Sequence, residues 1–255
     1  MKLLFIGDVV GDRGIDFLEE KIYSLKKEYS PDVIVVNGEN AANGNGVTEH
    51  SLKRLISLGA DVITTGNHAF SKRDSVELFD SYDFLLRPAN YPEEVIGKGV
   101  CVLDLGKASV AIINLQGTVY LDSLDNPFLT ADRLMSSLET KNIFVDFHAE
   151  ATAEKKAMGN YLRGRVTAVM GTHTHVQTSD ETILKEGTAY ITDVGMTGAE
   201  DSVLGVESDI ATRKLVTHYP VRFEISKNPQ FLNAIVIEFD EHSGKATKIE
   251  RIIKR

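Results

Sequence analysis

Short runs of apolar residues recur along the chain, and polar residues follow each run directly. The runs occupy residues 3–6, 33–36, 63–65, 143–145 and 166–170. They are rich in β-branched side chains, which favour buried strands. Open α/β sheets bind ligands at the carboxyl ends of their strands. The pattern therefore predicts several buried strands that each deliver functional groups to a common edge.

Helical periodicity fills the gaps between the first three of these strands. Ile15, Leu18, Ile22 and Leu25 follow one another at spacings of three or four residues, which predicts an amphipathic helix. A second helix is predicted after Thr48, whose side chain is of the type that caps a helix amino end. The order β-α-β-α-β with short connections predicts parallel strands and right-handed crossovers.

The rest of the chain predicts a mixed architecture. A helix is expected at about 74–79, hairpins at 99–115 and 183–192, and helices around 129–138 and 152–162. The tail should form an antiparallel pair, 231–239 with 246–253, that covers one sheet edge. No repeat or linker marks a boundary, so residues 1–255 are expected to form a single domain in which two α/β halves share one core.

Composition narrows the class of protein. The 42% hydrophobic and 25% charged residues are ordinary for a globular chain. A net charge of −9 argues against a broad nucleic-acid-binding surface, which requires clustered Lys and Arg. The lone Cys101 excludes an intrachain disulfide, and no signal peptide or membrane-spanning run is recognised. We therefore expect a cytoplasmic protein without membrane contact.

The His173-Thr174-His175 segment is the first candidate for metal binding. In an extended segment, residues two apart point to the same face, so both imidazoles would be available to one centre. Asp8 and Glu39 follow the first two strands, and two carboxylates brought together repel each other unless cations neutralise them. The alternatives are ordinary ones: a polar turn for the histidines, and capping of helices or turns for the carboxylates.

Other strand ends supply further donors. Asn40 and Asn67 could provide neutral oxygens, and His148 a third imidazole. Ligands of this kind without thiolate suit Fe, Mn or Zn better than Ca or Mg. His68 follows Asn67 and points elsewhere, so as an imidazolium it could protonate a leaving oxygen, or alternatively orient a ligand. The remaining histidines are expected to be solvated: His50, His218 and His242.

Taken in order, these motifs resemble the metallophosphoesterase (calcineurin-like) superfamily, and they are most similar to its YmdB-like branch. The motifs are Gly7-Asp8, Gly38-Glu39-Asn40, Gly66-Asn67-His68, the isolated His148 and Gly171-Thr172-His173-Thr174-His175. They span nearly the whole chain. The broader superfamily usually has Asp-x-His in the first motif, where this chain has Val10, and a bridging Asp in the second, where it has Glu39 followed by Asn40.

The resemblance implies an α/β fold, a four-layer α/β/β/α sandwich with two mixed sheets. It also implies two metal ions, with Fe preferred and Mn or Zn as alternatives, and His68 as the proton donor. One ion would be held by Asp8, Glu39, Asn40 and His175, and the other by Glu39, Asn67, His148 and His173.

The implied activity is hydrolysis of small phosphodiesters, with cyclic nucleotides such as 2',3'-cyclic AMP as the substrate class. The alternatives are a phosphomonoesterase or 5'-nucleotidase, and a regulator that binds a nucleotide or RNA without turning it over. The resemblance also allows a homo-oligomer. Specificity is expected from the loops at 41–48, 87–91, 117–127 and 196–204.

Overall fold

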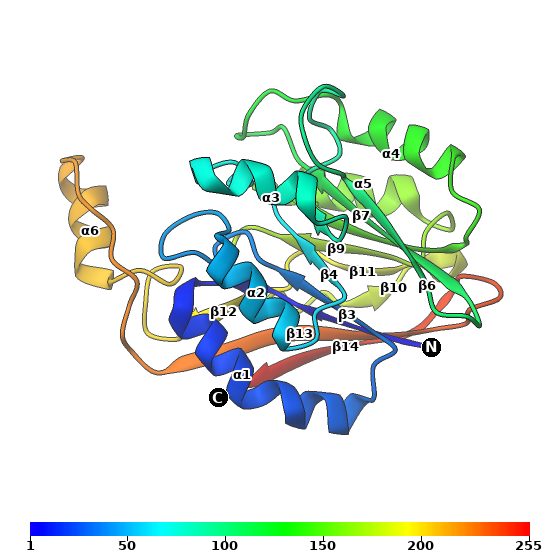
Figure 1. Ribbon diagram of the computed structural model, residues 1–255, viewed down its shortest axis with the longest axis horizontal. Helices are drawn as coiled ribbons and strands as arrows, with labels where there is room; N and C mark the ends of the chain where they lie inside the picture. The colour runs from blue at the N-terminus through cyan, green and yellow to red at the C-terminus, as the bar shows by residue number, and fades with distance from the viewer.

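Two mixed β-sheets face each other in the computed structural model, which describes residues 1–255 (Figure 1). The first sheet has eight strands in the order β2-β12-β13-β1-β3-β4-β5, with β14 paired to β13. The second sheet has six strands in the order β10-β11-β9-β8-β7-β6. The strands of the first sheet are β1 (Lys2–Ile6), β2 (Asp8–Val9), β3 (Val33–Asn37), β4 (Val62–Thr64), β5 (Leu85–Leu86), β12 (Met196–Ala199), β13 (Gln230–Phe239) and β14 (Ala246–Lys254). Those of the second are β6 (Val100–Asp104), β7 (Ser109–Gln116), β8 (Asn142–His148), β9 (Ala168–Thr172), β10 (Thr182–Ile183) and β11 (Ala189–Ile191).

Helices cover the outer faces of both sheets and complete the four layers (Figure 1). Helices α1 and α2 cover the first sheet, and α4 and α5 cover the second. The helices are α1 (Gly11–Tyr29), α2 (Glu49–Ser57), α3 (Val76–Ser81), α4 (Pro127–Ser136), α5 (Thr152–Leu162) and α6 (Ser208–Thr217), with short 3-10 turns at Arg73–Ser75 and Lys185–Gly187. None of these helices combines the length and apolarity that a membrane span requires.

The alternation of side chains along each strand separates the core into layers. Leu3 and Phe5 of β1 point between the two sheets, whereas Leu4 and Ile6 point toward the helices. In β8, Phe144 contributes to the layer between the sheets, and its neighbours on either side pack beneath α4 and α5. Successive side chains of a strand point to opposite faces. Because both faces of the central strands are covered, β1, β3 and β4 consist mostly of buried apolar residues, as the sequence indicated.

Most predicted elements are confirmed. The parallel pairs β1–β3 and β3–β4, the hairpin β6–β7 and the hairpin β10–β11 form as expected. Helix α2 begins after Thr48, whose hydroxyl accepts from the backbone N–H of Ser51 at 3.2 Å within a capping box. The tail pair β13–β14 also forms, with β13 pairing to β1 and β14 lying outside it. The predicted α/β sandwich is therefore the observed fold.

Helix α6 was not predicted. It stands on an arm that extends away from the body of the molecule (Figure 1). Ala211 is its one buried residue, so the segment lacks the apolar stripe that identifies a packed helix from sequence.

Candidate metal centre

The carboxyl ends of the central strands meet at one edge of the sandwich. In the first sheet, parallel pairing brings the ends of β1, β3 and β4 side by side, and Asp8, Glu39 and Asn67 follow them. In the second sheet, His148 of β8 pairs with Thr172 of β9, directly before His173. Because the two sheets pack face to face, donors from both reach a common site.

A glycine allows the two sheets to approach at this point. A Cβ atom on Gly66 would lie 2.0 Å from Cδ2 of the His148 ring. No side chain larger than hydrogen fits there without moving the imidazole. The glycine that ends β4 in the sequence pattern therefore makes room for a histidine that comes from the other sheet.

The predicted ligands form two groups of contacts. In one group, Nε2 of His175 lies 3.1 Å from Nδ2 of Asn40 and 3.6 Å from Oδ1 of Asp8. In the other, Nε2 of His148 lies 3.1 Å from Oδ1 of Asn67 and 3.3 Å from Oε1 of Glu39. Nδ1 of His173 completes the second group, 3.0 Å from Nε2 of His148. The structure thus brings together every residue that the sequence singled out as a ligand.

The donors contact one another, and no three His, Cys, Asp or Glu side chains are arranged as a preformed metal site. Two buried carboxylate oxygens of these donors nevertheless have no hydrogen-bond partner: Oδ1 of Asp8 and Oε2 of Glu39. Buried carboxylate oxygens are costly when they are unpaired. Unpartnered carboxylate oxygens among imidazole and amide groups fit a transition-metal cation. Metal binding itself stays a prediction.

Burial shifts the ionisation of the whole cluster. Loss of solvation raises the pKa of Asp8 and that of Glu39 to about 7 each. Burial lowers the pKa of His148 to about 4, and burial together with the neighbouring His148 lowers that of His173 to about 3. Burial also lowers the pKa of His175. The imidazoles are therefore neutral near pH 7, the form that binds metals.

The His173–His175 segment corrects one step of the sequence argument. The segment is not extended, because φ is 102° at His173 and 63° at His175. The two rings converge because the chain turns after β9, and the strand alternation assumed from the sequence does not apply. Their nearness to the other donors was predicted correctly, but the backbone geometry was not.

Buried groups beneath the site fix the orientation of the His148 ring. The hydroxyl of Thr172 lies 2.7 Å from Oδ1 of Asp146 and 2.9 Å from Nδ1 of His148. When Asp146 is ionised, this hydroxyl donates to the carboxylate and accepts from the Nδ1–H of His148. That arrangement leaves the lone pair of Nε2 directed at Glu39 and Asn67. Sequence reasoning missed Asp146, although a charged residue inside an apolar strand signals a buried polar network.

A buried ion pair holds the histidine turn. Nζ of Lys155 lies 2.6 Å from Oδ2 of Asp193, and both side chains are almost completely buried. The same carboxylate oxygen accepts from the backbone N–H of Thr174 at 3.0 Å and from its hydroxyl at 2.7 Å. Thr174 lies between the two histidines, so this network sets the shape of the turn. Neither Lys155 nor Asp193 was identified from the sequence.

His68 lies at the edge of the cluster with its ring facing a cavity of about 320 Å³. Its backbone N–H donates to Oε1 of Glu39 at 2.8 Å, and Nδ2 of Asn45 lies 2.9 Å from its Nε2. The ring is not directed away from Asn67 as expected, because Nδ2 of that residue lies 3.3 Å from Nε2. The cavity is also lined by Asn40, His173 and His175.

The expected specificity loops contribute unequally to this cavity. Residues 41–48 and 196–204 reach it through Gly44, Asn45 and Leu204, whereas residues 87–91 and 117–127 do not line it. Gly117 instead donates its N–H to the carbonyl of His148 at 2.9 Å, which supports the site from behind. His50, His218 and His242 are exposed, as predicted.

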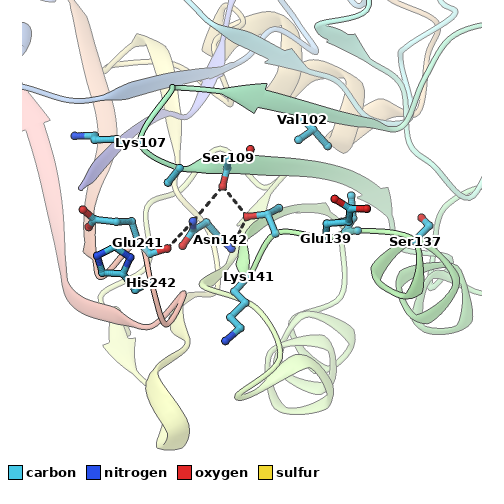
Figure 2. A pocket seen from close by; sticks show the side chains of 12 residues that line it. Val102, Lys107, Ser109, Ser137, Glu139, Lys141, Asn142, Glu241 and His242 are labelled. Carbon is cyan, nitrogen blue, oxygen red and sulfur yellow. Dashed lines mark hydrogen bonds between the residues drawn. The ribbon is translucent and has the colours of Figure 1, made fainter.

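A larger hollow of about 680 Å³ lies at the amino ends of β7 and β8, at the other end of the strands (Figure 2). Nδ2 of Asn142 donates to the carbonyl oxygens of Ser109 and Glu241 at 3.1 Å each, which ties the two sheets together. The side chains of Lys141 and Glu139 do not point toward one another there (Figure 2). This hollow therefore has a structural hydrogen-bond network and no convergent set of ligands.

The fold has clear counterparts among known proteins. The architecture is of the metallophosphoesterase type. A crystal structure of a novel phosphatase from Mycoplasma pneumoniae superposes with a TM-score of 0.95 at 35% identity, covering 100% of this chain and 93% of that chain. A hypothetical protein from Thermus thermophilus superposes with a TM-score of 0.94 at 36% identity, covering 100% of this chain and 99% of that one.

The family is shown by sequence comparison as well. The model of the YmdB-like protein family matches residues 4–252, and the chain belongs to this family. A relative from Bacillus subtilis (strain 168), named 2',3'-cyclic-nucleotide 2'-phosphodiesterase, is 49% identical over 255 residues, which are 99% of this chain and 97% of the relative.

Proposed function

We propose that this protein is a metal-dependent phosphodiesterase that hydrolyses small cyclic nucleotides such as 2',3'-cyclic AMP. The observation that carries the proposal is the pair of buried carboxylates, Asp8 and Glu39, each with an unpartnered oxygen, set among neutral imidazoles. The 49% identity to a relative named 2',3'-cyclic-nucleotide 2'-phosphodiesterase supports the substrate class.

Two transition-metal ions, with Fe preferred and Mn or Zn as alternatives, would be held by two sets of ligands that share Glu39. Asp8, Asn40 and His175 would complete one set, and Asn67, His148 and His173 the other. When bound, such ions offset the negative charge of the phosphate and favour ionisation of water at neutral pH. The cavity supports this assignment because no lysine or arginine lines it. A phosphate entering it would meet no lysine or arginine, so its charge requires a further cationic partner.

His68 is proposed to protonate the leaving alkoxide. Its ring faces the cavity, and its backbone N–H is anchored to Glu39, so the ring is held next to the proposed metal site. Asp146 and Thr172 keep His148 in one orientation, and Asp193 holds the turn that carries His173 and His175. These contacts preorganise the site, which is a main source of catalytic rate enhancement.

The proposal is tested by comparing His68→Ala with His50→Ala, an exposed histidine of α2 as the matched control. We expect His68→Ala to retain its metal content and to lose roughly a hundredfold or more in turnover of bis(4-nitrophenyl) phosphate and 2',3'-cyclic AMP. His50→Ala should match the wild type in both. Wild-type turnover by His68→Ala on every phosphodiester tested would contradict the assignment.

The novel phosphatase among the structural relatives makes a phosphomonoesterase the second candidate. Matched turnover of 4-nitrophenyl phosphate and its bis-ester separates the two, since preference for the monoester would favour the phosphatase. Metal-loaded protein that binds cyclic nucleotides without hydrolysing them would favour a regulator. A cytoplasmic location and homo-oligomerisation stay predictions from the sequence and its resemblance.

A further inference from the structure

One side of the active-site cavity is apolar, and the proposed chemistry does not use it. Its polar lining includes the side chains of Asn40, His68, His173 and His175. Four apolar side chains also line the cavity and come together at the bridge between Val206 and Ile225; we call them the apolar wall, defined as Val10, Leu204, Val206 and Ile225. The volume of about 320 Å³ is at the lower end of the range for small-molecule sites.

Leu204, Val206 and Ile225 of the wall come from the base of the arm that carries α6, and Val10 precedes α1. Val206 and Ile225 face each other across an antiparallel bridge. The backbone hydrogen bonds on either side of this bridge, Ser226 N to Gly205 O and Glu207 N to Glu224 O, are 2.9 Å each. The wall is therefore a hydrogen-bonded element that exists before any ligand binds, and ordering it on binding costs little.

The side chain of Ile225 packs closely against Gly11 at the start of α1. A Cβ atom on Gly11 would lie 2.3 Å from Cδ1 of Ile225, and Gly11 has a φ of +62° that only glycine adopts readily. Leu204 connects the wall to the proposed metal ligands, since its carbonyl oxygen lies 3.1 Å from Nδ1 of His175. The apolar wall and the imidazole cluster thus line one cavity and are in contact.

We propose that the apolar wall binds the nucleobase of the substrate. This inference rests on the proposed function and extends it to the part of the substrate that does not react. Valine, leucine and isoleucine side chains offer apolar contact and no hydrogen bond, so the wall cannot read the edge pattern of a base. The enzyme should accept bases of different hydrogen-bonding pattern with similar efficiency.

The charge of the cavity favours a base over further phosphates on this side. Glu150 is the only acidic side chain of the lining, which contains no lysine or arginine, and its Oε2 lies 3.0 Å from Nε2 of His173. A polyanionic chain that continued past the reacting phosphate would gain no cationic contact there. A mononucleotide, with one phosphate at the imidazoles and one base at the wall, matches both sides.

The test compares two substrates with the same reactive five-membered cyclic phosphate: 2',3'-cyclic AMP, and glycerol 1,2-cyclic phosphate, which has no base. For Ile225→Ala and for Leu204→Ala, we expect the ratio of kcat/KM for the nucleotide over the base-free substrate to fall roughly tenfold, mainly through KM. Leu215→Ala is the matched control, because it removes an equally apolar side chain from the same arm, 70% exposed and away from the cavity.

The proposal would be overturned if the ratio of kcat/KM for 2',3'-cyclic AMP over glycerol 1,2-cyclic phosphate were unchanged in both Ile225→Ala and Leu204→Ala. This holds whether the activities on the two substrates fall by the same factor or do not fall. Leu204 is 48% exposed, so its truncation leaves the fold intact even where Ile225→Ala is destabilised. Wild-type kcat/KM that differed more than about a hundredfold between cyclic purine and pyrimidine nucleotides would also contradict it, because apolar contact alone does not discriminate so strongly.

The outcomes separate this inference from the proposed function. Turnover of glycerol 1,2-cyclic phosphate by the wild type needs no wall and reports on the metal-dependent chemistry alone. If the wild type hydrolyses it and the ratio is insensitive to the wall, only the base-binding proposal fails. If the wild type hydrolyses neither substrate, both proposals fail.

Discussion

Replacing Lys155 by methionine removes one member of the buried ion pair that holds the histidine turn. Nζ of Lys155 lies 2.6 Å from Oδ2 of Asp193, and the two side chains are 1% and 0% exposed. Removing one partner of such a pair leaves a buried charge without compensation, which costs about 3–5 kcal/mol. Asp193 would still accept from Thr174 N, Thr174 Oγ1 and Gly195 N, so we place Lys155→Met near 3 kcal/mol.

The converse change, Asp193→Asn, should cost more, about 4–5 kcal/mol, because it leaves an ammonium group buried without a carboxylate. In the double variant no unpaired charge remains. Its loss of stability should therefore be smaller than the sum of the single losses by about 2–3 kcal/mol. The assay is urea unfolding followed by circular dichroism, with the free energy of unfolding extrapolated to water.

Lys156→Met is the matched control. Lys156 also forms a 2.6 Å ion pair, with Asp180, but both side chains of this pair are partly exposed. An exposed pair contributes at most about 1 kcal/mol, and the control should lose no more than that. Losses that added up in the double variant to within about 0.5 kcal/mol would refute the reasoning, because they would show that the two charges do not depend on each other.

Three further changes follow from named contacts. Glu39→Gln should lower the metal content measured by elemental analysis, because it removes the charge shared by both proposed ligand groups; full loading would contradict that role. Burial opposes ionisation of Asp180, but hydrogen bonds from Lys156, Thr192 and Thr178 outweigh it and hold its pKa below the usual range. The ionised Asp180 therefore stabilises the fold above about pH 4, and this contribution is lost as the pH falls through the folded pKa. The difference in free energy of unfolding between the wild type and Asp180→Asn should shrink as the pH is lowered. A difference that stays constant with pH would contradict this role of the Asp180 carboxylate. Thr48→Ala should lower the free energy of unfolding in urea by about 1 kcal/mol, because it removes the capping box of α2. The control is Ser57→Ala at an exposed position of the same helix, which should change stability by less than about 0.5 kcal/mol. Equal effects of the two changes would rule out the cap as the cause.

The layers of the fold were predictable because they depend on local periodicity. Ile15, Leu18, Ile22 and Leu25 form the buried stripe of α1 at helical spacing, and the parallel order of β1, β3 and β4 follows from the helices between them. The pairing of β13 with β1 was not predictable in the same way. It joins residues more than two hundred positions apart, and one sequence contains no local signal for such a partner.

The proposed ligands of the candidate site could be predicted from the sequence, but the buried residues that orient them could not. Asp8, Glu39, Asn67 and His148 each follow an apolar run, so their position at the strand ends could be read directly. The residues that orient them are polar groups buried in strands and helices. Lys155 of α5 is an example, since nothing in the sequence of an amphipathic helix shows that one lysine faces inward to meet Asp193.

The apolar wall of the cavity was also outside the reach of the sequence argument. Leu204 and Ile225 lie at the two ends of an arm whose helix has almost no buried face. Their nearness depends on the bridge between Val206 and Ile225, which forms only when the arm folds back on itself. Short bridges of this kind carry no periodic pattern that could be recognised in advance.

Asp8, Glu39 and the surrounding imidazoles are proposed to bind catalytic metal ions. Elemental analysis of freshly purified protein, paired with hydrolysis of bis(4-nitrophenyl) phosphate before and after chelation, tests it most directly. We expect about two transition-metal ions per chain, and turnover that chelation removes and metal restores. Protein that contains no metal after reconstitution, or that retains full turnover when the metal has been removed, would contradict it.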